Sequence, residues 1–328
     1  MRHRLPALLV AAMLLVVMVA PVQARTPEQS RHDAILAYWT PARMAAATPR
    51  DFVFNGAGFS PAAKPDRPPG GGGGGGGDTT GSSWNGGGKV QTLTGKVYFT
   101  MGSSNYICSG TVATDHRSGY SLVLTAGHCA YDETARAFAT NWMFMPDFDG
   151  ENTYSCPQTQ YGCWTAQALV VHEGYATAGG FNTQATLHDF AFAVVPAGGR
   201  TTSQLDALGS YPVVIPGFTA PGQRAYAFGY PAAQKYKGYD LVYCAGSIFE
   251  DPYNDSLTWG LPCDMTGGSS GGPWFSDFST STQNGGLSSL NSYGYSGVKA
   301  MHGPKFNSDT QAVYNAADGA MTNTIVGP

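Results

Sequence analysis

One stretch of the sequence could carry nucleophilic chemistry: residues 266–273, Thr-Gly-Gly-Ser-Ser-Gly-Gly-Pro. Glycine permits the positive φ angles and close backbone approach of a tight turn, so the stretch can hold Ser270 at a turn apex. The amides of Gly268 and Ser270 would then point into one concavity and stabilise the oxyanion of a tetrahedral intermediate. A flexible glycine–serine linker is the competing interpretation, and the surrounding sequence must decide between the two.

A general base and an orienting carboxylate are also present. His128 ends an apolar run and is followed by a cysteine, so the turn that carries it can be fixed at hydrogen-bond distance from a nucleophile. Asp189 precedes the apolar run 190–195, and a buried aspartate is costly unless it is paired. Pairing with His128 would fix the tautomer of the imidazole. Asp147 and Asp149 are rival carboxylates, but no apolar run follows them.

The order His128, Asp189, Ser270 bears on the fold. The spacing Gly268-x-Ser270-x-Gly272 also satisfies the nucleophile elbow of α/β-hydrolases, whose order is Ser, acid, His and whose parallel strands alternate with helices. Here the serine comes last, and helical periodicity is nearly absent before a helix-forming stretch at 310–321.

Short runs of β-branched and aromatic residues bounded by turn residues predict an all-β fold, a barrel or a sandwich. These runs are 95–100, 106–112, 121–125, 168–172, 190–195, 224–229, 241–244, 272–275 and 297–301.

Four segments together resemble the trypsin-like (chymotrypsin-fold) serine peptidases, in particular a secreted bacterial branch akin to glutamyl endopeptidases. They are 108–111, 124–129, 188–192 and 267–273. The resemblance covers about residues 90–328. It implies an all-β fold of two six-stranded antiparallel β-barrels with the active site between them, and a short C-terminal helix. It also implies a disulfide between Cys108 and Cys129.

The resemblance implies a secreted serine endopeptidase in which Ser270 attacks the peptide carbonyl, His128 transfers the proton and Asp189 orients His128. An acyl-enzyme forms and is hydrolysed, and no cofactor is expected. The alternative is a non-catalytic homologue that binds a partner in the same cleft, although such proteins usually lack a triad residue. One position departs from the animal digestive members, in which an aspartate before the nucleophile receives the new N-terminal amine. Here it is Ser269, so activation of a zymogen would work differently, for example by removal of an occluding segment.

Two residues favour opposite substrate preferences. Asp264 matches the position that attracts Lys or Arg at the base of the specificity pocket in trypsin-like members. His302 resembles the histidine that neutralises a substrate carboxylate in glutamyl endopeptidases, and Thr266 could add a hydroxyl. We favour an acidic residue at P1, before the scissile bond, with apolar and basic preferences left open.

The N-terminal region predicts export. A basic end, an apolar run at 8–19 and a small-x-small site predict a signal peptide over 1–24, and the apolar run is too short to span a membrane. Residues 25–88 read as a propeptide and glycine-rich linker, or as a disordered extension, and 89–328 as the peptidase domain. Two short helical pieces are expected at 35–39 and 42–47.

The six cysteines fit an exported chain stabilised by disulfides. Six cysteines allow 15 pairings, but chain order groups them into local pairs. These are Cys108 with Cys129, Cys156 with Cys163, and Cys244 with Cys263. No zinc-ligand spacing is present, and the acidic turn 147–151 lacks the full calcium-loop pattern, so we expect no metal.

Charge excludes one further class of partner. The net charge is −4 and lysine and arginine form no cluster, which argues against nucleic-acid binding. We therefore expect a secreted monomer that acts on protein or peptide substrates without stable membrane association.

Overall fold

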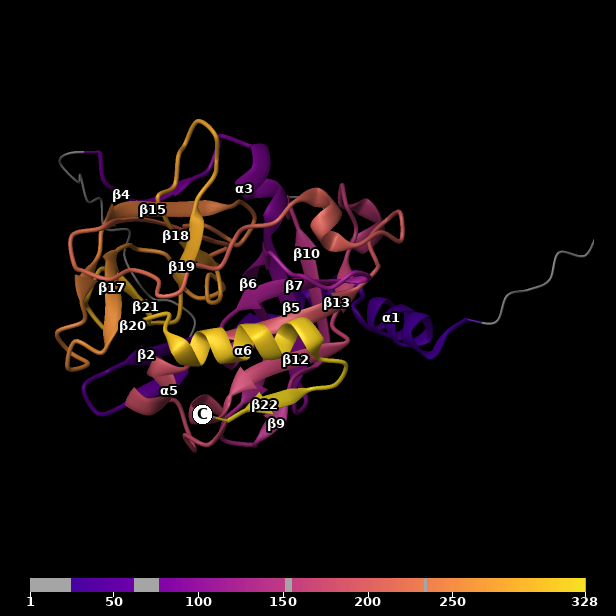
Figure 1. Cartoon of the computed structure of the whole chain (residues 1–328), viewed down its shortest axis with the longest axis horizontal. Helices are drawn as coiled ribbons and strands as arrows, with labels where there is room; N and C mark the ends of the chain where they lie inside the picture. The colour runs from indigo at the N-terminus through magenta and orange to yellow at the C-terminus, as the bar shows by residue number, and fades with distance from the viewer. Residues whose placement is uncertain (1–24, 62–76, 151–154, 233–234, 328) are drawn as a thin grey trace, which may run out of the picture.

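The computed structural model describes residues 25–61, 77–150, 155–232 and 235–327. Two bodies of β-structure lie side by side, and helix α6 (Ser308–Gly319) lies across the face shown in Figure 1. The predicted signal peptide and most of the glycine run lie outside the described residues. None of the helices in the described ranges is long and apolar enough to cross a membrane.

The first body is one curled sheet with the order β11-β10-β5-β6-β7-β13-β12-β22. The strands in this order are antiparallel to their neighbours except for β22, which runs parallel to β12. Its strands are β5 (Thr94–Met101), β6 (Ser104–Ala113), β7 (Tyr120–Thr125), β10 (Thr140–Pro146), β11 (Trp164–Thr165), β12 (Ala168–His172), β13 (Ala191–Pro196) and β22 (Thr324–Val326). Every residue of β12 and β13 is buried, which accounts for their continuous apolar sequences.

The second body contains two sheets. One has the order β19-β18-β14-β15-β4, with β4 (Thr79–Ser83), β14 (Arg224–Gly229), β15 (Val242–Ser247), β18 (Pro273–Ser276) and β19 (Gly286–Leu290). The other has the order β16-β17-β21-β20-β2-β3, with β2 (Phe52–Phe54), β3 (Phe59–Pro61), β16 (Phe249–Glu250), β17 (Thr258–Pro262), β20 (Tyr293–Tyr295) and β21 (Ala300–Pro304). The two-barrel, mostly antiparallel fold expected from the sequence is confirmed.

Short elements connect these strands. They are α3 (Gly88–Leu93), η1 (Gly127–Cys129), β8 (Tyr131–Asp132), β9 (Ala137–Phe138), η2 (Cys156–Gln158), α4 (Glu173–Ala176), α5 (Thr183–Leu187) and η3 (Leu205–Leu208). All three local cysteine pairs form disulfides: Cys108–Cys129, Cys156–Cys163 and Cys244–Cys263.

The expected C-terminal helix is α6. It begins at Ser308 because the Asn307 side chain accepts hydrogen bonds from the backbone nitrogens of Asp309 and Thr310. Val313 and Ala317 are fully buried on the face that packs against β12 and β13. The helix therefore covers the first barrel, and the chain then adds β22 to that barrel's sheet.

The N-terminal region is folded onto the barrels. Helix α1 (Pro27–Tyr38) starts with a capping box between Thr26 and Gln29, and α2 (Pro41–Ala46) follows directly. The two predicted helical pieces are therefore present, and α1 begins earlier than expected. Strand β1 (Thr48–Pro49) pairs with β6, and β2 pairs with β20. The described part of this region is thus docked on both barrels and is not a free extension.

Residues before the predicted domain start at residue 89 already contact the second barrel. Strand β4 pairs with β15, so the second barrel already includes Thr79–Ser83. The Trp84 ring packs edge-on against Phe228 and Tyr243, with ring centroids 5.4 and 5.3 Å apart. Strand β4 contains only glycine, serine and threonine and lies one residue after the glycine run, so its sequence resembles a linker.

Candidate active site

Ser270 lies in a tight turn just before β18, and two glycines make that turn possible. Gly268 has φ +97° and Gly271 has φ +81°, values that residues with a side chain rarely adopt. Space is also lacking, because a Cβ on Gly268 would lie 2.7 Å from the Tyr230 carbonyl oxygen and one on Gly271 would lie 2.3 Å from Thr125 Oγ1. The glycine-rich stretch is therefore a packed turn, which excludes the linker interpretation.

Both barrels hold this turn in place. From β6, the Ser109 hydroxyl donates to the Gly268 carbonyl at 2.8 Å and the Ser109 backbone nitrogen donates to the Ser270 carbonyl at 2.7 Å. From the second barrel, Asn291 Nδ2 donates to the Ser269 carbonyl at 3.0 Å. Sequence reasoning did not give Ser109 or Asn291 a role. Ser109 belongs to a segment that carried the resemblance, but neither residue has a local pattern that marks it as a support for the turn.

His128 and Asp189 form the second part of the site. His128 lies in η1 directly after β7, where the Cys108–Cys129 disulfide fastens η1 to β6. Asp189 Oδ2 lies 2.8 Å from His128 Nδ1, and Asp189 Oδ1 accepts a hydrogen bond from the His128 backbone nitrogen at 2.8 Å. The Ser292 hydroxyl also donates to Asp189 Oδ2. Both side chains of the pair are fully buried, and Asp189 holds His128 at two points, one on its backbone and one on its ring.

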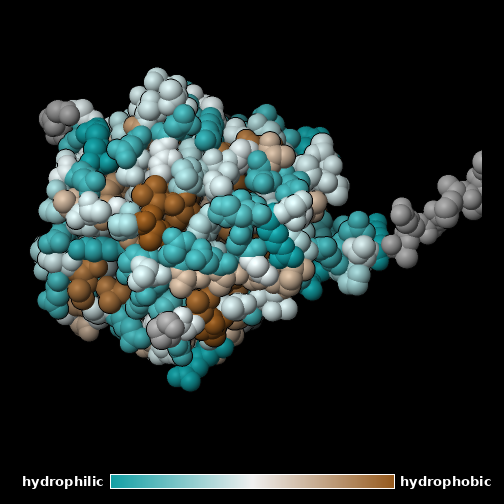
Figure 2. All heavy atoms as spheres, in the orientation of Figure 1, coloured by the Kyte–Doolittle hydropathy of each residue, from teal (hydrophilic) through white to brown (hydrophobic). Residues whose placement is uncertain are grey.

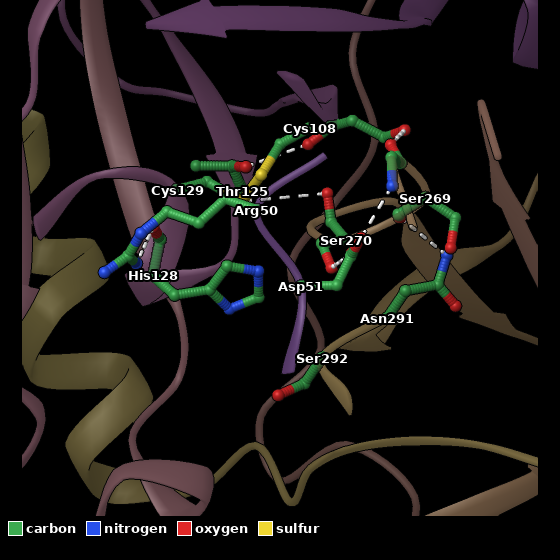
Figure 3. Close-up of a disulfide and its surroundings, with 12 residues drawn as sticks. Arg50, Asp51, Cys108, Thr125, His128, Cys129, Ser269, Ser270, Asn291 and Ser292 are labelled. Atoms are coloured by element: carbon green, nitrogen blue, oxygen red, sulfur yellow. Dashed lines mark hydrogen bonds between the residues drawn. A yellow bond between two sulfur atoms is a disulfide. The ribbon is translucent and has the colours of Figure 1, made fainter. Parts of the chain in front are cut away.

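A residue from the N-terminal region lies between the two parts. The Ser270 hydroxyl donates to Asp51 Oδ1 at 2.6 Å, and the Gly268 backbone nitrogen lies 3.3 Å from the same oxygen. His128 Nε2 is buried and has no hydrogen-bond partner within the described part of the chain. Figure 3 shows Asp51 beside Ser270, with the His128 ring facing the same space. In this structure, therefore, the Ser270 hydroxyl donates its hydrogen bond to Asp51 and not to His128.

The surroundings of Asp51 shift its acidity. Burial raises the pKa of the Asp51 carboxyl above its usual value, because the charged form loses its hydration. The hydrogen bond from Ser270, the neighbouring His128 and the Gly268 amide act in the opposite direction. Sequence reasoning missed Asp51, since an aspartate between an arginine and a phenylalanine in a propeptide has no distinguishing pattern.

Two of the predicted substrate-binding residues lie near the turn. Thr266 is half-buried, and its carbonyl accepts hydrogen bonds from the backbone and hydroxyl of Ser269. The Asp264 carboxylate accepts a hydrogen bond from the Tyr236 hydroxyl and pairs with Lys235 at 3.0 Å. Asp264 is thus paired with a cation of the same chain, which weakens the case for a basic substrate preference.

His302 lies on β21 in an aromatic surrounding. Its ring stacks on Tyr293 at 5.3 Å and meets Tyr295 edge-on at 4.9 Å. Its Nε2 lies 3.7 Å from Asp251 Oδ1, and Asp251 also accepts hydrogen bonds from both tyrosine hydroxyls. The side chain is fully buried, and this burial lowers the pKa of His302 to about 4 even though Asp251 opposes the shift. His302 is therefore uncharged at neutral pH in this state.

Two clusters place possible metal-binding atoms close together among the described residues. The first contains Cys108 and Cys129, which are consumed by their disulfide. The second contains His172, His188 and Asp309. The two imidazoles stack with centroids 4.5 Å apart and planes 9° apart, and His188 Nε2 lies 3.1 Å from Asp309. A histidine nitrogen binds a metal ion that lies in the plane of its ring. Because these two rings are stacked in parallel planes, one ion cannot lie in the plane of both.

Many solved structures resemble this chain, and three of them bear on its family. The protease Anisep from Arthrobacter nicotinovorans is 38% identical, with a TM-score of 0.60, over 70% of this chain and 96% of that one. The thermostable serine protease AL20 from an extremophilic microorganism is 34% identical, with a TM-score of 0.60, over 71% of this chain and 99% of that one. A Glu endopeptidase in complex with MPD is 20% identical, with a TM-score of 0.54, over 74% and 99%, and shows the fold alone. No family model and no curated protein matches the chain.

Proposed function

The chain belongs to the trypsin-like (chymotrypsin-fold) serine peptidases, and from this premise we propose that it cleaves peptide bonds with the triad Ser270, His128 and Asp189. It is a serine-type endopeptidase that acts on protein or peptide substrates. The observation that carries the assignment of residues is the doubly hydrogen-bonded pair of His128 and Asp189, which faces the glycine-bounded turn of Ser270.

The proposed mechanism follows from this geometry. Once the Ser270 hydroxyl is free of Asp51, it donates to the buried Nε2 of His128, which is the remaining acceptor on that ring. His128 takes the proton as Ser270 attacks the substrate carbonyl, and Asp189 stabilises the resulting imidazolium. His128 then protonates the leaving amine. Water hydrolyses the acyl-enzyme by the same steps in reverse order.

Two backbone amides stabilise the negative charge that develops on the substrate oxygen. Gly268 and Ser270 contribute these amides, and the Gly268 nitrogen already donates to a carboxyl oxygen, that of Asp51. A donor of this kind contributes about 2.7–4 kcal/mol to lowering the barrier. The hydrogen bonds from Ser109 and Asn291 keep the turn rigid, so the donors do not have to reorganise during the reaction.

The finer part of the proposal is a preference for an acidic P1 residue, with His302 as the group that faces the substrate carboxylate. Neutral His302 beside Asp251 does not attract a second carboxylate, so the preference requires His302 to take up a proton when the substrate binds. Matched peptides with Glu, Gln and Leu at P1 test this. A preference for Glu over Gln that strengthens from pH 8 to pH 5 and disappears in His302→Gln supports it, and equal cleavage of Glu and Gln peptides excludes it.

The whole proposal is tested at Ser270. A fluorophosphonate should label the wild-type protein at Ser270 and leave Ser270→Ala unlabelled, and Ser270→Ala should lose proteolysis. Undiminished proteolysis by Ser270→Ala would overturn the assignment. The second candidate, a non-catalytic homologue that binds a partner, predicts no labelling of the wild type.

We extend the proposal to the maturation of the protein. The chain is exported by the signal peptide 1–24, acts outside the cell as a monomer, and is made as a zymogen. Three disulfides support export, because such bonds persist in oxidising compartments. Mass spectrometry of the secreted product tests this assignment by reporting its N-terminus directly.

A further inference from the structure

The N-terminal segment from Thr48 to Pro61 crosses the active site from one barrel to the other. Strand β1 adds to the first barrel, with Thr48 opposite Tyr106 of β6. Strand β2 adds to the second barrel, with Phe52 opposite Tyr293 of β20. Only Arg50 and Asp51 lie between these two strands. The pairings therefore fix those two residues at the point where the barrels meet.

Asp51 occupies the position of a reacting group. One oxygen of its side chain accepts hydrogen bonds from the Ser270 hydroxyl and the Gly268 amide. The residue is only 8% exposed. The fit is close, because a Cβ on Gly267 would overlap Asp51 Oδ2. A backbone amide placed to donate to a developing oxyanion can also donate to an oxygen of a carboxyl group.

Arg50 fixes the segment from the other side. Its guanidinium donates to the His128 carbonyl and to Glu133, whose oxygen lies 3.3 Å away. Glu133 is buried and is also held by the Tyr175 hydroxyl at 2.8 Å. A buried, hydrogen-bonded arginine–carboxylate pair has a demanding geometry, so it sets the register of the segment against the catalytic histidine.

Aromatic residues complete the contact. Phe52 stacks on Phe181 with centroids 4.1 Å apart and meets the His128 ring edge-on at 5.5 Å. Phe59 packs against Phe181 at 5.2 Å and against Tyr293 at 5.3 Å. Phe181 and Tyr293 are thus covered by two phenylalanines that follow the aspartate in the sequence.

We infer that the segment Thr48–Pro61 is an inhibitor built into the chain, and that the catalytic cleft is a binding site for a peptide in which aromatic side chains follow an acidic one. The inference rests on the proposed function of Ser270 and His128. The segment blocks the reaction in two ways: Asp51 takes the Gly268 amide of the proposed oxyanion site, and it accepts the Ser270 hydrogen bond in place of His128 Nε2.

The segment avoids cleavage because of the group it presents. A substrate presents a peptide carbonyl, whose carbon is attacked and whose amine leaves after protonation by His128. Asp51 presents a carboxylate, whose carbon is a poor electrophile because charge is shared over both oxygens, and which has no amine to release. Activation then requires cleavage of the chain after Pro61 and departure of the segment from the cleft.

The intact chain provides the first test. The rate at which a fluorophosphonate labels Ser270 is measured for the wild type, for Asp51→Ala and for a control, Asp33→Asn, with mass spectrometry to confirm that each chain is uncleaved. Asp33 is a carboxylate of the same region that is partly exposed and paired with Arg25. We expect labelling of Asp51→Ala to be at least tenfold faster than that of the wild type and of Asp33→Asn. Equal rates for all three overturn the inference.

A second test does not depend on how the variants fold. A site for a sequence-specific endoprotease replaces part of the glycine run, and the full chain is cleaved there. The cleaved protein is then diluted so that the N-terminal segment dissociates. A peptide of residues 47–61 is expected to slow Ser270 labelling and to inhibit hydrolysis competitively. The same peptide with Asp51→Ala should need at least tenfold higher concentration, and equal potency of the two peptides contradicts the inference.

These readouts separate the two proposals. If the nicked chain neither reacts with the fluorophosphonate nor cleaves any peptide, the proposed function fails. Docking is then still measured by the fluorescence anisotropy of the labelled 47–61 peptide. Tighter binding of the Asp51 peptide than of its alanine variant supports the docking site. If the nicked chain is active and the peptides have no effect, the function stands and the inhibitor is excluded.

Discussion

Asp189 binds His128 through two separate atoms of the histidine, the backbone nitrogen and Nδ1, each at 2.8 Å. The backbone contact positions the η1 turn, and the ring contact sets the orientation and tautomer of the imidazole. Both oxygens of Asp189 are used, and the Ser292 hydroxyl adds a further donor to Oδ2. One buried carboxylate therefore couples the loop of the first barrel to the start of β20 in the second.

The first prediction concerns this pair. In Asp189→Asn the side-chain amide can donate to His128 Nδ1, which favours the tautomer with its proton on Nε2 and removes the acceptor that Ser270 needs. We expect kcat to fall by about ten-thousandfold while the fold is kept. Ser292→Ala removes one of the donors to Asp189 and should reduce kcat by about tenfold, the equivalent of one hydrogen bond. Steady-state kinetics on the processed protein measures both effects, and circular dichroism checks that the fold is kept. A kcat of Asp189→Asn within tenfold of the wild-type value would contradict the assigned role.

The second prediction concerns the oxyanion turn. Gly268→Ala introduces a Cβ 2.7 Å from the Tyr230 carbonyl at a φ of +97°, so the turn must shift and its amide must leave the oxyanion site. We expect kcat to fall about 100-fold or more. The matched control is Gly119→Ala, where φ is +91° and no atom lies within 4 Å of the added Cβ. It carries the same backbone strain, about 1–2 kcal/mol, without the clash, and should keep its activity. Similar kcat losses in the two variants would show that the effect comes from strain alone.

The third prediction concerns His302 and the stability of the fold. Because burial lowers the pKa of His302 to about 4, the unfolded chain binds a proton between about pH 6.5 and pH 4 that the folded chain does not bind. The free energy of unfolding should therefore decrease as the pH falls through this window, by up to about 1.4 kcal/mol per pH unit from this group. Urea denaturation of Ser270→Ala at several pH values measures the slope. In the same background, His302→Gln should show a shallower slope, and an unchanged slope would contradict the prediction.

The fourth prediction concerns Lys96, a buried lysine in β5. Its ammonium donates to the Gly238 carbonyl at 2.9 Å and lies 4.2 Å from the centroid of the Phe148 ring, yet burial lowers the pKa of Lys96 to about 7. The unfolded chain holds the proton up to about pH 10.4, so stability should rise with pH from 7 towards 10 by up to about 1.4 kcal/mol per unit. Lys96→Met should remove this rise. Chemical denaturation of both proteins between pH 7 and pH 9.5 is the measurement, and parallel curves would exclude the assignment.

The sequence by itself determined the parts of this protein that are encoded locally. Turn glycines around Ser270, an apolar run ending at His128 and a second one starting after Asp189 each have a local physical cause, so the candidate triad was readable from residue types and order. Alternation of apolar runs with turn residues determined the all-β class, and chain order gave the three cysteine pairs later found bonded. Nine predicted strands correspond to observed ones, with shifts of a few residues at their ends.

Other features depended on contacts between distant segments, which local patterns do not encode. Strand β4 exists because β15 offers it an edge, although its own sequence resembles a linker. The surroundings of His302, and so its pKa, come from Tyr293, Tyr295 and Asp251 on neighbouring strands. Asp51 lies 219 positions before Ser270, and only the pairing of β1 and β2 with opposite barrels brings it there. The tertiary structure thus decided which group occupies the active site, because that choice is made by strand pairing across the cleft.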